Sequence, residues 1–544
     1  MNKKFKELVD QILSFRWQTY PTEATYLGIH DFDSQLEKTD QQSRQMAKEA
    51  NQKYLEKLQN FSGPDLDDGE KMDWKILAAN LEAEIKLEEE HKKFERDAGI
   101  YPELAATSCY ILLLREFAPL KVRLQSLQER LEQIPRFLEE GKENLRKGGN
   151  IPHIWTEVAI EVAQSSVSFF EGMVPEAANQ VSELRQSVLQ ANQVAIQALK
   201  DYERFVRQEI LPRSNGSFAL GKELFEFLLL KMHGLPYDTD YLCQTGNRVI
   251  RETTSQLEQL AAQIDGTKSW EAILDQLKGI HPQPEELLDF YQKEMAYARD
   301  FVRSKDLASI PDREELKIIE TPVFYRAIIP YAAYLPPPAF EERQVGYYWV
   351  TPVNRNATLE QQQEQLEGHS SFKATVTSLH EAYPGHHLQL LWANRVDSKV
   401  RRTFWTSVFA EGWALYCEEL MYEEGFYSDP RTRLVQLRDQ LWRACRVVID
   451  VSLHSGKISF QEAVDMLVDV AKLEKSNAIA EVKRYTKEPT QPMSYLMGKL
   501  EILKLREDYR KKKGAEFNLK EFHNRLLSYG TIPVQMVREN MLGN

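Results

Sequence analysis

A histidine-rich segment interrupted by proline and glycine constrains this chain more than any other feature. It reads HEAYPGHH and spans residues 380–387. In the helical motif HExxH the two histidines are four residues apart, so both imidazoles face one Zn²⁺. Here His386 follows His380 by six residues, which on a regular helix turns it about 120° away from that face. Pro384 lacks a backbone donor and Gly385 tolerates unusual dihedral angles, so they predict an interruption that returns His386 to the metal.

His387 is the alternative second ligand. On an intact helix it lies about 10.5 Å along the axis from His380, too far for two ligands that each approach Zn²⁺ to about 2.0–2.1 Å. We therefore expect His380 and His386 to bind the metal, with His387 in supporting contact behind them. Glu381, beside the first histidine, is the expected general base. Three of the chain's 11 histidines lie in this segment, which argues against a chance grouping.

The third expected ligand is Glu411, in the helical run Val400–Glu424. It lies among apolar and small residues, where a carboxylate is unfavourable unless it is paired or binds a metal. Glu418 and Glu419 begin an acidic stretch that is more typical of a solvated face. Two histidines and one glutamate leave a fourth position open, as in catalytic zinc sites. A structural zinc site is disfavoured because the four cysteines show no paired spacing: Cys109, Cys243, Cys417 and Cys445.

The segments around this motif resemble a bacterial family named domain of unknown function 885. The resemblance rests on HEAYPGHHLQ and on further segments along the chain: YPTEATYLGIHDFDSQL, FAEGWALYCEEL, RVVIDVSLHSG, EVKRYTKEPTQPMSYLMGK and FHNRLLSYGTIP. That family is similar in turn to the helical gluzincin peptidases typified by neurolysin and carboxypeptidase Taq. The resemblance implies a mainly α fold, a large helical bowl with a deep central cleft and zinc on its floor. Those peptidases carry plain HExxH, without the Pro-Gly insertion.

Long amphipathic segments dominate the chain and predict helices. They are Glu70–Arg96, Leu120–Lys147, Pro175–Leu211 and Tyr241–Gly266. We expect an N-terminal helical lobe over residues 1–310 and a metal-site catalytic lobe over residues 311–544, joined by a linker at Ser304–Pro311.

Two segments rich in β-branched and aromatic residues predict a small sheet just before the metal motif. They are Lys317–Ile329 and Val345–Val353. An edge strand there could bind an extended peptide through its backbone, with Tyr347 and Tyr348 contacting the substrate. The alternative is a structural hairpin with stacked aromatic rings.

The helical run Arg431–His454 carries polar residues on one face. Arg446, Asp450 and His454 recur at intervals of four residues. They could form a row of ion pairs on the surface, or line the cleft. In the second interpretation Asp450 orients a zinc-ligating histidine, while Arg446 and His454, with Arg484 further along, contact substrate.

Hydrolysis at a metal also requires a donor to the developing oxyanion, usually tyrosine or histidine. The candidates are Tyr495, Tyr485 and His523. Tyr495 is favoured because Pro492 and Gly498 flank it, which predicts a helix start packed closely against a neighbour.

Composition limits the remaining classes. A net charge of −13 over 544 residues disfavours nucleic-acid binding, which needs clustered basic surface. No apolar stretch is long enough for a transmembrane helix, and the N-terminal residues lack a secretory hydrophobic region. Scattered cysteines are typical of a reducing cytoplasm. The oligomeric state stays open.

Together these observations predict a zinc-dependent peptidase that acts on short oligopeptides. Two alternatives remain: a metal-dependent hydrolase of another amide or ester, and a non-catalytic ligand-binding protein on a peptidase-like fold.

Overall fold

The computed structural model describes residues 2–61, 65–321, 326, 329 and 331–543. It is mainly helical, with 72% of the chain in helices and 3% in strands. This confirms the mainly α fold with one small sheet that the sequence predicts. The bowl and the deep cleft stay predictions.

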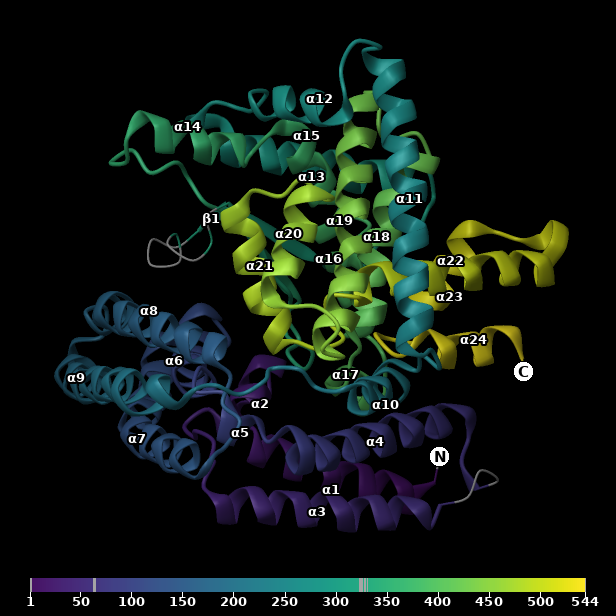
Figure 1. The fold of residues 1–544 in the computed structure, drawn as a ribbon. Coiled ribbons are helices and arrows are strands. Elements are labelled where there is room, and N and C mark those ends of the chain that lie inside the picture. Colours follow the sequence, from purple (N-terminus) through teal and green to yellow (C-terminus); the bar gives the residue numbers. More distant parts are fainter. Residues whose placement is uncertain (1, 62–64, 322–325, 327–328, 330, 544) are drawn as a thin grey trace. The chain divides into compact units, whose positions relative to one another are not determined.

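The chain forms two compact units, which are described separately. One comprises Met1–Phe218 with Pro338–Glu341, and the other comprises Ala219–Pro337 with Glu342–Asn544. The division falls far before the linker predicted at Ser304–Pro311, which lies within the second unit. The reason is that α11 (Thr239–Ile264) packs along α19 (Pro430–His454), a helix that lies beyond the metal motif in the sequence (Figure 1).

The first unit is a stack of long helices around a core built largely by α6, α7, α8 and α9. Its helices are α1 (Lys3–Thr19), α2 (Pro21–Leu27), α3 (Gln41–Gln59), α4 (Asp68–Lys86), α5 (Lys93–Arg96), α6 (Ile100–Leu114), α7 (Leu120–Lys147), α8 (His153–Ala178) and α9 (Ser182–Phe205). The sequence predicted α7 with its exact bounds. The helix predicted over Pro175–Leu211 is confirmed from Ser182 onward, but its first residues belong to α8, because a turn at residues 179–181 separates α8 from α9.

The second unit holds the metal motif and the sheet. Its remaining helices are α10 (Lys222–His233), α12 (Trp270–Lys278), α13 (Leu287–Ser304), α14 (Leu359–Glu367), α15 (Ser371–Glu381), α16 (His386–Ala393), α17 (Lys399–Thr403), α18 (Ser407–Glu423), α20 (Phe460–Asp469), α21 (Lys475–Lys487), α22 (Ser494–Lys513), α23 (Leu519–Leu527) and α24 (Val534–Leu542). The run predicted at Val400–Glu424 is two helices, because the Thr406 side chain caps the start of α18.

Within the described residues, β1 (Glu315–Glu320), β2 (Ala332–Leu335) and β3 (Val345–Val350) form one sheet in the order β1-β3-β2. β3 pairs parallel with β1 and antiparallel with β2, so both of its edges are occupied. The interpretation of Val345–Val353 as a peptide-binding edge strand was therefore wrong. The strand predicted over Lys317–Ile329 is confirmed only as far as Glu320, and its residues 322–325 and 327–328 lie outside the described part.

Candidate metal centre

The metal motif is two helices joined by a short break. α15 ends at Glu381, residues 382–385 are not helical, and α16 begins at His386. A side chain on Gly385 would come within 1.8 Å of the His380 carbonyl oxygen, so only glycine fits there. The Pro384 carbonyl accepts a hydrogen bond from the Trp413 indole of α18 at 2.8 Å. The interruption that the Pro-Gly pair predicts is therefore present.

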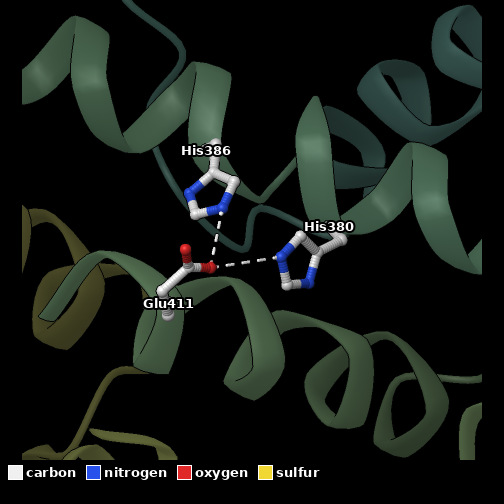
Figure 2. A group of neighbouring side chains, drawn as sticks. All are labelled: His380, His386 and Glu411. Atoms are coloured by element: carbon white, nitrogen blue, oxygen red, sulfur yellow. Dashed lines mark ion pairs between the residues drawn. The ribbon is translucent and has the colours of Figure 1, made fainter. Parts of the chain in front are cut away.

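This break brings His380, His386 and Glu411 together, as Figure 2 shows. Glu411 Oε2 lies 3.6 Å from His380 Nε2 and 3.3 Å from His386 Nε2. One ligand atom from each of the three residues lies within 4.8 Å of the other two. The side chains come from α15, α16 and α18, so each occupies a separate rigid helix.

The separations of Glu411 from the two histidines suit a tetrahedral metal ion. Two atoms that each bind Zn²⁺ at about 2.0–2.1 Å stand roughly 3.3 Å apart, which matches the separations of Glu411 Oε2 from the two imidazoles. That oxygen is buried and forms no other hydrogen bond with the described residues. Burial lowers the pKa of His380, but the contacts with Glu411 and Glu418 outweigh it and raise that pKa to about 10. The carboxylates of Glu411 and Glu418 therefore favour a positive charge at this position.

Glu418 holds the His380 side chain in place. Sequence reasoning missed this role. Glu418 is buried rather than solvated, and its Oε1 lies 2.8 Å from His380 Nδ1. A carboxylate only accepts, so Nδ1 donates the hydrogen, and Nε2 is the ring nitrogen that would bind a metal ion. The solvated face predicted for Glu418 was therefore wrong. A signal was present, since Glu418 follows Glu411 by two helical turns and shares its face.

His387 points away from the group and is fully buried. Its Nδ1 lies 3.0 Å from the Tyr334 hydroxyl on β2, and its Nε2 lies 3.3 Å from Glu314 Oε2. Burial lowers the pKa of His387 despite the Glu314 carboxylate. His387 therefore links α16 to the sheet. Among the described residues, its side chain forms no hydrogen bond with His380 or His386.

Tyr495 lies closest to the group among the three oxyanion candidates. Its ring stacks against His380 with centroids 6.2 Å apart. Gln491, which sequence reasoning missed, reaches both the Tyr495 hydroxyl and Glu411 Oε1 at 3.5 Å. Burial and the Glu411 carboxylate raise the pKa of Tyr495, so its hydroxyl stays protonated and can donate. The Arg446 guanidinium lies 4.6 Å from the centre of the Tyr495 ring.

The other two candidates are engaged elsewhere. Tyr485 is buried and accepts a hydrogen bond from Arg446 Nε at 2.7 Å. His523 uses both ring nitrogens, with Nδ1 2.7 Å from the Leu307 carbonyl and Nε2 2.7 Å from the Tyr416 hydroxyl. Their contacts are those of core residues, which leaves Tyr495 as the remaining candidate.

The polar row on α19 is buried rather than exposed, but only Arg446 approaches the group. Asp450 accepts from the backbone N–H groups of Thr490 and Met493, at 3.3 and 3.2 Å. His454 Nε2 lies 3.0 Å from the Tyr485 carbonyl. The interpretation of Asp450 as the partner of a metal-ligating histidine does not hold in this structure, because Glu418 makes that contact.

The remaining predicted substrate residues have ordinary surroundings. Arg484 pairs with Glu481 and Glu488. Tyr348 is fully buried on β3, and Tyr347 lies beneath the Lys317 ammonium. Arg484 also donates to Gln491 Oε1 at 2.8 Å, and Gln491 in turn reaches Glu411. Burial and the negative charge of Glu381 raise the pKa of Tyr348.

Glu381 differs from every other polar residue of the motif. It ends α15, directly after His380, and its side chain is half-buried. Among the residues that the structure describes, none forms a hydrogen bond or an ion pair with its carboxylate. It is not one of the three grouped ligands, and its negative charge contributes to the raised pKa values of His380 and Tyr348.

Comparison with known protein families shows which family this chain belongs to. Residues 21–541 match the family described as bacterial protein of unknown function, DUF885. The chain belongs to this family. The match confirms the family resemblance of the motif segments and covers both compact units of this DUF885 protein. A comparison with curated proteins gave no match.

Two solved structures share the fold of this DUF885 chain. One is described as a "putative lipoprotein" of unknown function from Shewanella oneidensis; it is 24% identical, covers 99% of each chain and has a TM-score of 0.83. The other, from Colwellia psychrerythraea, carries the same lipoprotein description. It is 18% identical, with a TM-score of 0.85, over 100% of this chain and 98% of that chain.

Proposed function

We propose that this DUF885 protein is a zinc-dependent peptidase that hydrolyses short oligopeptides. The observation that carries the proposal is the convergence of His380, His386 and Glu411, with Glu381 beside them and otherwise unengaged. The same combination of two histidines, one carboxylate ligand and an adjacent glutamate underlies the proposed kinship with gluzincin peptidases.

His380, His386 and Glu411 would hold the ion, and Glu418 would fix the first imidazole. A Zn²⁺ bound there supplies Lewis acidity, polarising the scissile carbonyl and making a water acidic enough to attack it. Glu381 would take the proton from the attacking water on a carboxylate oxygen and pass it to the leaving nitrogen. The Tyr495 hydroxyl would donate a hydrogen bond to the oxygen on which negative charge develops.

Two other functions use the same parts. Hydrolysis of another amide or ester would need the same metal group and base. A non-catalytic binding protein would need the ligands but not a glutamate free of structural contacts, so Glu381 favours chemistry.

The decisive experiment combines metal analysis with a peptide digest. Purified protein loaded with Zn²⁺ is expected to hold one ion per chain, and to cleave members of a mixed short-peptide library as followed by mass spectrometry. We expect Glu381→Gln to keep the ion and the melting temperature while activity falls by about 10²–10⁴-fold, the contribution of a general base.

Parental activity in Glu381→Gln would remove that residue from the mechanism. A folded protein that contains a cleaved sequence serves as the second substrate, and we expect it to stay intact. Internal cleavage of the folded protein at the peptide rate would contradict the restriction to short peptides.

For location we propose the cytoplasm, on the evidence of scattered free cysteines. In the described residues no helix is long and apolar enough to cross a membrane. The two solved structures carry lipoprotein descriptions, which favour the cell envelope as the competing location. Fractionation of cells that express the full-length gene distinguishes the two.

A further inference from the structure

Positively charged side chains gather beside the metal group, around a single buried carboxylate. Arg438 and Arg443 lie on α19 on either side of this carboxylate, Asp439. Asp439 Oδ1 lies 3.1 Å from Arg438 Nε and 3.8 Å from Arg443 Nη1. Lys373 on α15 completes the cluster, with its ammonium 5.0 Å from the centre of the Tyr331 ring. The two helices pack against each other.

The cluster has more positive than negative charge. Three cations share Asp439, and the nearest further carboxylate acting on Lys373 is that of Glu474, which is largely exposed and pairs with Lys278. The Nε atoms of Arg438 and Arg443 are buried and form no hydrogen bond within the described residues. Burial lowers the pKa of Lys373, and Arg438 lowers it further. Partly buried cations that share a single carboxylate leave positive charge uncompensated, so the cluster favours an incoming anion.

The cluster lies within reach of the proposed reaction. Lys373 and His380 share one face of α15, two turns and about 10.5 Å apart. The Arg443 guanidinium lies 5.6 Å from the centre of the Tyr495 ring, which stacks on His380. An extended peptide advances about 3.3 Å per residue, so a group held by the cluster would be one to three residues from a bond held at the metal group.

We propose that Lys373, Arg438 and Arg443 form a subsite for a carboxylate of the peptide substrate. The proposal rests on the peptidase function above and adds a substrate class: peptides with a carboxylate one to three residues from the cleaved bond. Planar guanidinium groups suit carboxylates, since they donate two parallel hydrogen bonds. The carboxylate could be the C-terminus of the peptide or an acidic side chain.

Binding is tested on Zn²⁺-loaded Glu381→Gln protein, which removes the proposed base and leaves the cluster intact. The probes are acetyl-tetraalanine as free acid and as amide, and acetyl-Ala-Ala-Glu-Ala-amide with its Gln counterpart. Their dissociation constants are measured by ligand-observed NMR. We expect the carboxylate form of at least one pair to bind about 10- to 100-fold more tightly, the range of a hydrogen-bonded charged group. A preference within the first pair identifies the C-terminus, and one within the second pair identifies a side chain.

Substitutions then locate the preference. Lys373→Gln and Arg443→Gln, each made in the Glu381→Gln background, are expected to abolish it. Lys504→Gln, an exposed lysine on α22, is the matched control and should keep it. Melting temperatures verify folding, and if Arg443→Gln does not fold, Lys373→Gln decides. No preference in either pair, or a preference that survives in the folded cluster variants, overturns the proposal.

Turnover separates this proposal from the peptidase function. Cleavage of free-acid and amidated peptides at equal rates, with no Glu preference, would leave the peptidase standing and overturn the subsite. Carboxylate binding that depends on Lys373, without cleavage of any peptide, would support the subsite and overturn the peptidase.

Discussion

At the scale of single residues, two adjacent histidines have opposite tasks. His386 faces Glu411, whereas His387 contacts Glu314 and Tyr334. The break at residues 382–385 sets this difference, because it restarts the helix with His386 as its first residue. The choice between the two could be made from sequence, since spacing on a helix and the Pro-Gly pair were sufficient.

Removing each histidine in turn tests this division. We expect His386→Ala to lose bound Zn²⁺, since a metal ligand is gone. His387→Ala should keep most of the metal and lower the melting temperature, because α16 loses its contacts with Glu314 and β2. Metal content by mass spectrometry checks both. Loss of metal from the His387 variant alone would reverse the assignment.

A second prediction at the scale of single residues concerns Glu418. Its hydrogen bond fixes the His380 ring, so Glu418→Gln is expected to weaken zinc binding by about 10- to 100-fold. Competition with a chelating dye measures the affinity. The matched control is Glu423→Gln, which removes a charge at an exposed position of the same helix. Equal affinity in both variants would mean that the bond does not support the ligand.

At the scale of elements, the site depends on the close crossing of α18 and α22, which carry Glu411 and Tyr495. At the crossing, a side chain on Gly412 would come within 2.4 Å of the Gly498 Cα atom, and one on Gly498 within 1.8 Å of the Val408 carbonyl oxygen. Only glycine allows this approach. The sequence predicted close packing at Gly498, but not its partner.

Gly498→Ala tests the crossing. The added methyl group collides with rigid backbone, so the free energy of unfolding should fall by about 1–3 kcal/mol or more, and the metal affinity should fall as Glu411 moves. Gly172→Ala is the control, because its methyl group meets nothing within 4 Å in α8; it should be neutral or stabilising by about 1 kcal/mol. Chemical denaturation compares them. Equal stabilities would contradict the close crossing.

The strands show where sequence reasoning stops. Residue types indicated strands near Lys317 and Val345, and both exist. Which strand occupies the middle depends on pairing between distant segments, and neither segment's own residues encode it. The same limit applies to Asp450, whose partners Thr490 and Met493 lie on another segment. Local periodicity predicts the elements, whereas long-range packing decides the neighbours.

At the scale of the whole molecule, the second unit contains several buried, neutral histidines. Burial lowers the pKa of each to about 4: His233, His369, His454 and His523. In the unfolded chain their pKa is about 6.5. Between these values the unfolded state binds protons that the folded state does not, so acid favours unfolding.

We therefore expect the free energy of unfolding to fall as the pH drops from about 6.5 to 4, by up to roughly 1.4 kcal/mol per pH unit for each such histidine. Urea denaturation at several pH values measures the slope. His233 lies between the Thr406 and Thr490 hydroxyls, and His233→Gln should make the slope shallower. His153→Gln, at an exposed histidine, should not. Identical slopes in the two variants would contradict this origin.

The short segment Pro338–Glu341 has a consequence for how this molecule can be taken apart. It belongs to the first unit although its neighbours on both sides belong to the second, so the polypeptide passes between units at residues 218–219, 337–338 and 341–342. Within the first unit, Phe340 packs against Trp17, and Glu341 lies 3.5 Å from His30. No uninterrupted stretch of the gene therefore encodes either unit, and a protease cut between residues 218 and 219 leaves Pro338–Glu341 of the first unit covalently attached to the second.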